Sequence, residues 1–176
     1  DREAKYPVYI WNHLPSSAAS IIHPHVQILI DTMPTAYQRR LLEASQRYFA
    51  SKGKNFWEDL ASEEKRLGER YIWGNESLSV IASYAPQGNR EIQFIFKGIS
   101  NLLDLSELQI VDFAHCIAKV LQGYRQMGID SFNLSTFSGP LGEELGYYSL
   151  NAKIISRPPM RSFYRNDTGV LERLHY

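Results

Sequence analysis

Two histidines and a glutamine alternate along one short stretch of the sequence, the His-Pro-His-Val-Gln run at residues 23–27. Apolar residues flank this run on both sides, which predicts a β-strand. Because the side chains of a strand alternate between its two faces, His23, His25 and Gln27 should share one face. Two imidazoles and an amide would then project together from a segment whose apolar neighbours predict burial.

Three kinds of chemistry are open to this arrangement. In the first, the histidines are half-buried, hydrogen-bonded and purely structural. In the second they bind a metal ion, because histidine is a common zinc ligand and alternate strand positions can share one ion. Two ligands do not complete a tetrahedral site, however, and the other candidate ligands in the sequence are carboxylates, His13, His115, His175 and Cys116.

The third is covalent catalysis on a phosphate ester. A neutral imidazole nitrogen would attack phosphorus while a backbone carbonyl accepts a hydrogen bond from the other ring N–H, and the amide of Gln27 would donate to a phosphoryl oxygen. Residues 12–20, just before the histidines, are a turn followed by small side chains, which lets backbone amides approach a ligand closely. This segment is either a plain loop or a phosphate cradle, in which Ser20 would supply a further donor.

The elements that must position these residues follow from periodicity and turn signals. β-Branched and aromatic side chains predict a strand at 6–11, which should pair with the histidine strand. Capping residues followed by apolar residues at helical spacing predict helices, and the strands lie between turns. The predicted helices are 35–50, 56–67 and one between Ser106 and Gly128, and the further strands are 70–73, 78–85, 91–97, 131–137 and 147–156. The fold class is therefore α+β with antiparallel sheets.

The last third of the chain repeats the organisation of the first: a strand, a loop of small residues and a second strand. Laying residues 151–155 on residues 23–27 keeps the alternation but places Asn151 and Lys153 where the two histidines stand. If the repeat is a duplication, the first copy alone carries nucleophilic chemistry.

Composition limits the other function classes. The chain has 176 residues, of which 44% are hydrophobic, enough for one domain or for one domain and part of another. Its 19 basic and 19 acidic residues cancel, which argues against a nucleic-acid partner. A single cysteine excludes an internal disulfide and favours the cytoplasm. No apolar run approaches the roughly 20 residues that span a membrane, and the missing initiator methionine suggests a fragment.

Asn12 together with the Ser-Ile-Ile-His-Pro-His-Val-Gln run at 20–27 resembles the signature of the galactose-1-phosphate uridylyltransferases and their relatives, the nucleotidyl-transferring branch of the histidine-triad superfamily. The resemblance implies histidine-triad-like antiparallel sheets with packed helices, in tandem halves of which the first is truncated. Residues 1–34 would be the C-terminal part of the first half, 35–69 a helical connection, and 70–176 the second half with a degenerate motif.

The resemblance also implies roles for individual residues. His25 would be the nucleophile that accepts the nucleotidyl group. Gln27 and Ser20 would bind the phosphate of that group, and Asn12 would help to hold the nucleotide phosphates. His23 would be a ligand of a structural zinc ion whose other ligands lie outside this chain.

Two further features of the family fall on positions of this chain that match less well. A second metal site in the family uses two histidines where Asn151 and Lys153 stand, so that site is expected to be absent. A sugar-contacting glutamate of the family would correspond to Glu172.

The expected function is that of a nucleotidyltransferase most like UDP-glucose:hexose-1-phosphate uridylyltransferase of galactose metabolism. It would move UMP or AMP between a nucleoside diphosphate sugar and a sugar 1-phosphate or phosphate through a covalent nucleotidyl-histidine. The alternatives are a phosphorylase of ADP-sugars or dinucleoside polyphosphates and a non-catalytic nucleotide-binding or oligomerisation module. A hydrolase is disfavoured, because simpler histidine-triad proteins have a further histidine where Gln27 stands. Neither nucleic acid nor a membrane is an expected partner, and a homodimer is left open.

Overall fold

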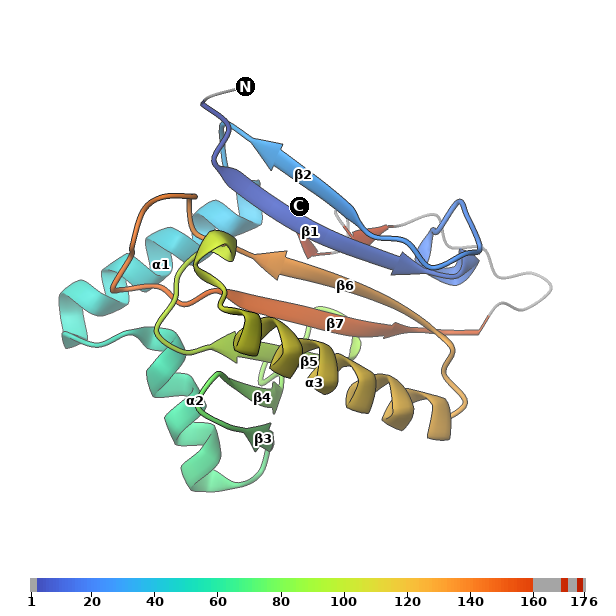
Figure 1. Ribbon diagram of the computed structural model, residues 1–176. Coiled ribbons are helices and arrows are strands. Elements are labelled where there is room, and N and C mark those ends of the chain that lie inside the picture. The colour runs from blue at the N-terminus through green and yellow to red at the C-terminus, as the bar shows by residue number, and fades with distance from the viewer. Residues whose placement is uncertain (1–2, 160–168, 171–173, 176) are drawn as a thin grey trace.

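The computed structural model describes residues 3–159, 169–170 and 174–175. These residues form a seven-stranded sheet with helices on both of its faces (Figure 1). The strand order is β2-β1-β6-β7-β5-β4-β3, and all neighbouring strands are antiparallel. The strands are β1 (Tyr6–His13), β2 (Gln27–Asp31), β3 (Tyr71–Gly74), β4 (Leu78–Ala82), β5 (Asn89–Phe96), β6 (Ser131–Phe137) and β7 (Asn151–Arg157). The predicted α+β class is confirmed, and strands from both predicted halves lie in one sheet.

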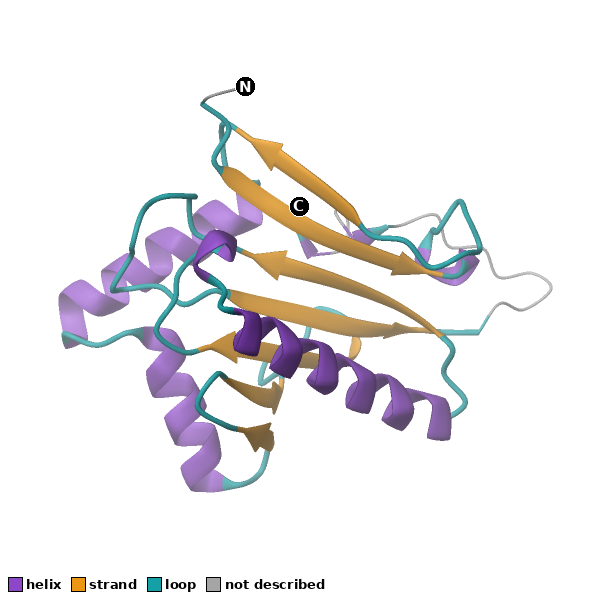
Figure 2. Ribbon diagram, viewed as in Figure 1, coloured by secondary structure: helices purple, strands orange, loops and turns teal. Residues whose placement is uncertain are grey.

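Helices accompany the sheet (Figure 2). Three of them have both ends within the described residues, and each of these three follows a capping residue that the sequence supplies. The hydroxyl of Thr35 accepts from the Gln38 N–H, the Asn55 side chain accepts from the Trp57 N–H, and Ser106 forms a complete capping box. No helix among the described residues is long and apolar enough to cross a membrane. The helices are α1 (Ala36–Lys52), α2 (Phe56–Leu67) and α3 (Glu107–Gln126), and the 3₁₀ turns are η1 (Pro15–Ser17) and η2 (Leu102–Asp104).

The helices cover opposite faces of the sheet. In Figure 1, α3 crosses the face nearer the viewer, and α1 and α2 lie behind the strands. The core under α3 includes Phe94, Leu134 and Ile154. On the other face, Trp57 of α2 packs with Ile81 and Ile95. Because strand side chains alternate, β1 and β4 to β7 each contribute side chains to the packing on both faces.

The centre and the edge of the sheet differ sharply in burial. Every residue of β6 and β7 is buried, whereas all five residues of β2 are exposed. The apolar run after the histidines was predicted to be buried, and this is wrong for the described chain: Ile28 is 62% exposed and Ile30 51%. The reason is position, because β2 is an edge strand with β1 as its one neighbour.

The histidine strand is also shorter than predicted, because β2 begins at Gln27 and the two histidines precede it. Pro24 has no N–H to donate to a ladder, and the His23 carbonyl is used by the ring of His25. Strand β7 likewise starts later than predicted, at Asn151, because the Tyr148 N–H closes a turn onto the Leu145 carbonyl.

Candidate active site

The ring of His25 lies in the irregular segment leading into β2 and is oriented by the backbone. Its Nδ1 atom is 3.0 Å from the carbonyl oxygen of His23. A carbonyl oxygen can only accept a hydrogen bond, so Nδ1 carries the proton, and Nε2 keeps its lone pair when the ring is neutral. The imidazole of His25 is half-buried, and its role as a nucleophile through Nε2 stays a prediction.

His23 is exposed, and the centroid of its ring lies 5.4 Å from that of His25. Among the described residues, no three His, Cys, Asp or Glu side chains lie close enough together to bind one metal ion. His13 and His175 instead stack on phenylalanine rings. The described residues therefore do not make a zinc site around His23, and its role as a metal ligand stays a prediction.

The register of β2 against β1 places Gln27 on one face of the sheet. Gln27 pairs with Ile10, and directly paired residues share a face, so Gln27 lies on the face on which Ile10 packs, the one covered by α1. The pairing of the two strands ends at Gln27, and His25 and Asn12 lie beyond it. Gln27 is exposed and Asn12 half-buried, so both remain within reach of a ligand in solution.

The turn between β1 and the histidines has a strained backbone. Leu14 has φ 69° and ψ 162°, and Ala18 has φ 63° and ψ 29°, conformations that residues with a Cβ rarely adopt. Such a residue costs on the order of 1–3 kcal/mol unless its surroundings impose the conformation. The Ser17 N–H and hydroxyl both donate to the Leu14 carbonyl, at 3.0 and 2.7 Å. This strained turn ends just before Ser20, which is exposed.

Two buried side chains from the central strands contact this turn and Asn12. Asn133 of β6 donates through Nδ2 to Asn12 Oδ1, at 2.6 Å, and to the Ser17 carbonyl, at 3.0 Å. Arg157 of β7 donates through Nε to the Ser16 carbonyl, at 3.1 Å. Neither residue was predicted from the sequence, because each lies 116 to 141 residues from the groups that it contacts. For Asn133 the available signal was the alternation of polar Ser131, Asn133 and Ser135 with apolar residues.

Asn151 and Lys153, the residues laid on the two histidines in the predicted repeat, are buried and bonded to other protein groups. Lys153 Nζ is 3.1 Å from Glu91 Oε1, and the two side chains are 6% and 0% exposed. The same ammonium donates to the Tyr37 hydroxyl and to Gln87 Oε1, both at 3.1 Å. Asn151 is fully buried and donates two hydrogen bonds of 3.1 Å. These side chains connect β7 to its surroundings. The predicted sugar contact, Glu172, lies outside the described residues.

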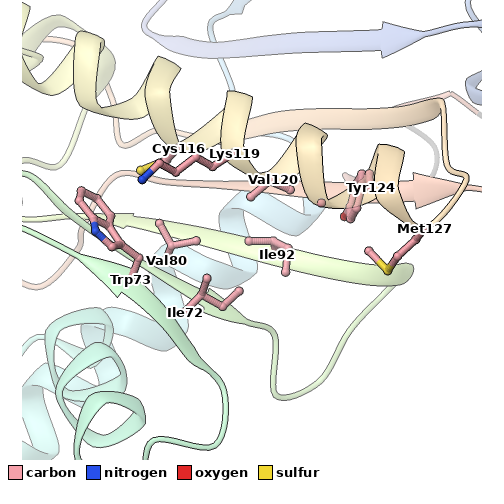
Figure 3. A pocket seen from close by; sticks show the side chains of 10 residues that line it. Ile72, Trp73, Val80, Ile92, Cys116, Lys119, Val120, Tyr124 and Met127 are labelled. Carbon is pink, nitrogen blue, oxygen red and sulfur yellow. The ribbon is translucent and has the colours of Figure 1, made fainter.

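A separate apolar cavity of about 390 Å³ lies between α3 and strands β3 to β5 (Figure 3). Trp73, Ile92 and Met127 are among its lining residues. Cys116 also lines it, and burial raises the pKa of that thiol, which disfavours a reactive thiolate. The cavity is on the α3 face, whereas Gln27 is on the α1 face, so it contributes no group to the histidine site.

Comparison with known proteins agrees with the arrangement of strands and helices. No protein-family model matches the chain. A solved structure of a uridylyltransferase superposes with a TM-score of 0.79 at 23% sequence identity, covering 94% of this chain and 51% of that one. The chain has the uridylyltransferase fold. Two plant proteins share this fold. A GalT-like protein from Arabidopsis thaliana superposes with a TM-score of 0.77 at 20% identity, covering 99% of this chain and 60% of that one. An ADP-glucose phosphorylase from the same plant, with bound ADP-glucose, superposes with a TM-score of 0.78 at 20% identity, covering 92% of this chain and 52% of that one.

A relative by sequence is an uncharacterized protein from Archaeoglobus fulgidus, which is 33% identical over 178 residues. The match covers 98% of this chain and 52% of the archaeal protein. The chain therefore spans about half the length of that relative and of the uridylyltransferase whose fold it shares. The resemblance stated on residues 12 and 20–27 is thus confirmed at the level of the uridylyltransferase fold.

Proposed function

We propose that this chain carries the nucleotidyl-accepting histidine of a nucleotidyltransferase. The reaction moves UMP or AMP from a nucleoside diphosphate sugar to a sugar 1-phosphate or to inorganic phosphate, with a covalent nucleotidyl-His25 as intermediate. The observation that carries the proposal is the 3.0 Å contact between His25 Nδ1 and the His23 carbonyl, which leaves Nε2 free to attack. The position of His25 after the small side chains at 16–20, on a uridylyltransferase fold, supports the same reaction.

The reaction is a double displacement. In the first step, the Nε2 lone pair forms a bond to the α-phosphorus, and the bond from that phosphorus to the bridging oxygen breaks, which releases the sugar 1-phosphate. The proton on Nδ1 stays in its hydrogen bond to the His23 carbonyl, so the modified ring is an imidazolium and a good leaving group. In the second step, an oxygen of the acceptor phosphate attacks the same phosphorus, and Nε2 leaves with its electron pair.

Phosphate binding is assigned to Asn12, Ser20 and Gln27. Negative charge on the non-bridging oxygens is stabilised by donors that are already in place, which lowers the barrier without reorganisation. The Gln27 amide and the Ser20 hydroxyl are exposed and can donate to these oxygens. His23 would hold a structural zinc ion together with ligands from outside the described chain, and neither step requires that ion.

The solved structures with this fold suggest two candidates for the nucleotide base of the donor, uracil and adenine. One solved neighbour is a uridylyltransferase and another is an ADP-glucose phosphorylase with bound ADP-glucose. We propose UDP-glucose as the first donor to test and ADP-glucose as the second. With ADP-glucose, inorganic phosphate is the expected acceptor.

The test is covalent labelling by UDP-glucose or ADP-glucose that carries ³²P at the α-phosphate. The assay uses the 176-residue chain and the complete gene product that includes it, each with and without added zinc. We expect label that is lost in acid and retained in base, as for a phosphoramidate, and that is released by glucose 1-phosphate or phosphate. His25→Ala should lose the label, whereas His115→Ala, a change at an exposed histidine on α3, should retain it.

Two outcomes would count against the proposal, and they differ in meaning. If neither nucleotide sugar labels the complete gene product, the covalent mechanism is wrong. If label survives in His25→Ala, the mechanism holds but the nucleophile is another residue.

A further inference from the structure

The strongest remaining feature is the buried contact between the central strands and the turn that precedes the histidines. Asn133 is 0% exposed and donates to two acceptors, Asn12 Oδ1 and the Ser17 carbonyl. Ser17 is itself fully buried, within a turn flanked by the positive-φ residues Leu14 and Ala18. The side-chain amide of Asn133 on β6 thus contacts both Asn12, a predicted phosphate-binding residue, and the strained turn.

The contact also decides which end of the Asn12 amide faces a ligand. Asn12 Oδ1 accepts from Asn133 Nδ2, at 2.6 Å, and from the backbone N–H of Val170, at 3.3 Å. Both contacts fall on the oxygen, so the Nδ2 group of Asn12 is the end that can donate. A phosphate oxygen can accept such a donor, whereas it would be repelled by the Oδ1 end of a rotated amide.

We propose that Asn133 is a positioning residue for nucleotide phosphate binding, because it fixes the amide of Asn12 and the strained turn before Ser20 in the geometry that receives the α-phosphate. Arg157 acts with it by donating to the Ser16 carbonyl, the neighbouring acceptor of the same turn. The inference rests on the proposed function for the identity of the ligand. The hydrogen bonds themselves do not depend on it.

Asn151 provides a matched control for Asn133. Both asparagines are 0% exposed, lie on adjacent central strands, and donate two hydrogen bonds each. Asn151 donates to Tyr148 and Ser149, which are not part of the turn. Asn151 Oδ1 also accepts a hydrogen bond from Gln93, at 3.4 Å. Replacing either residue by alanine removes two donated hydrogen bonds at a fully buried position, so slower labelling in Asn133→Ala alone reports on the contact with Asn12 and the turn.

The first measurement is the second-order rate constant for labelling of His25 by UDP-glucose, at temperatures where each variant is fully folded. We expect Asn133→Ala to lower it by about tenfold to about a hundredfold, since a small misplacement of positioning groups has effects of this size. Asn151→Ala should stay within about twofold of the wild type, and in an Asn12→Ala background Asn133→Ala should have less effect than it has alone. Equal loss in the two alanine variants, or full additivity with Asn12→Ala, would overturn the proposal.

The second measurement does not depend on catalysis. The Ser17 and Ala18 amides donate within the turn, and their hydrogen exchange should become faster in Asn133→Ala but not in Asn151→Ala. If the wild type is not labelled at all, the proposed function fails. The inference then rests on this exchange and on the affinity for UDP: weaker UDP binding and faster exchange in Asn133→Ala support it, and unchanged values refute it. If Asn133→Ala does not fold, Asn133→Ser takes its place in both measurements.

Discussion

Strands β2 and β7, which are associated with the two segments compared in the proposed repeat, occupy opposite environments in one sheet. Strand β2 is at the edge, and all five of its residues are exposed, whereas β7 is central and all seven of its residues are buried. The polar residues associated with each differ accordingly. The histidines before β2 make few protein contacts, and His25 keeps Nε2 available, whereas Lys153 has three polar neighbours at 3.1 Å.

The difference shows how one alternating pattern is exposed in one place and packed in another. A reacting group must reach a ligand in solution, which the sheet edge permits and the sheet centre does not. A buried polar group must have its hydrogen bonds satisfied within the protein, since desolvation without a partner is costly. Alternating polar residues are therefore accessible beside β2, where a site is proposed, and form a hydrogen-bonded network on β7.

The largest effect that tests this comparison is expected from Lys153→Met. The variant would leave the carboxylate of Glu91 buried without its ion-pair partner, which we expect to lower the free energy of unfolding by about 3–5 kcal/mol. Urea denaturation at pH 7 measures the loss. Lys65→Met, at an exposed position on α2, is the control and should change stability by less than about 0.5 kcal/mol.

A second substitution separates the ion pair from the packing of the Lys153 side chain. Replacing both members, Lys153→Met with Glu91→Leu, removes the unpaired charge and should recover most of the lost stability. If Lys153→Met alone costs no more than the Lys65→Met control, the central strand does not depend on its polar network and the comparison breaks down.

The second prediction concerns the protonation state of His175, which covers the central strands on the α1 face. Its Nε2 atom is 2.7 Å from the Ser135 hydroxyl, and its ring is fully buried. Burial, and then the nearby Lys153, lower the pKa of His175 to about 4, from 6.5. The folded state therefore favours the neutral ring. The contribution of His175 to the free energy of unfolding is fully present above about pH 6.5 and is lost as the pH falls toward 4.

The expected loss from this one group is about 2 kcal/mol in the free energy of unfolding between pH 7 and pH 5. Urea denaturation across that range measures it. In His175→Asn the decrease should be smaller by this amount, while His115→Asn, at an exposed position, should keep the full decrease because His175 is still present. An unchanged slope in His175→Asn would assign the acid sensitivity to other groups.

Local signals in the sequence predicted much of the fold, because they depend on neighbours along the chain. The helix predicted at 56–67 and the strand predicted at 131–137 have the observed bounds, and the capping box at Ser106 is formed. The exposure of β2 was not predictable in this way. Alternation and apolar content describe a strand, but they do not say whether it has one neighbouring strand or two.

The same distinction applies to the candidate site. A hydrogen bond from a ring N–H of the nucleophilic histidine to a backbone carbonyl was expected, and His25 makes one with a residue two positions away. The buried support from Asn133 and Arg157 was not expected, because it depends on how β6 and β7 pair with distant parts of the chain. The assignments of phosphate-binding residues and of His23 as a zinc ligand stay predictions.

The smallest effect tests whether the turn before β2 is strained while β7 is not. Ala18 has φ 63°, whereas its neighbour Ala19 has no positive φ, as is also true of every residue of β7. Ala18→Gly should relieve the conformation and raise the free energy of unfolding by up to about 1 kcal/mol, after the extra entropy of glycine in the unfolded chain is subtracted. Ala19→Gly makes the same chemical change without strain to relieve, so it should lower that free energy by about 0.5–1 kcal/mol.

Changes of opposite sign in the free energy of unfolding of the two variants, measured by urea denaturation, would show that backbone strain is localised at the approach to the histidines. Equal losses would mean that the turn is relaxed, and the support from Asn133 would then act on Asn12 alone.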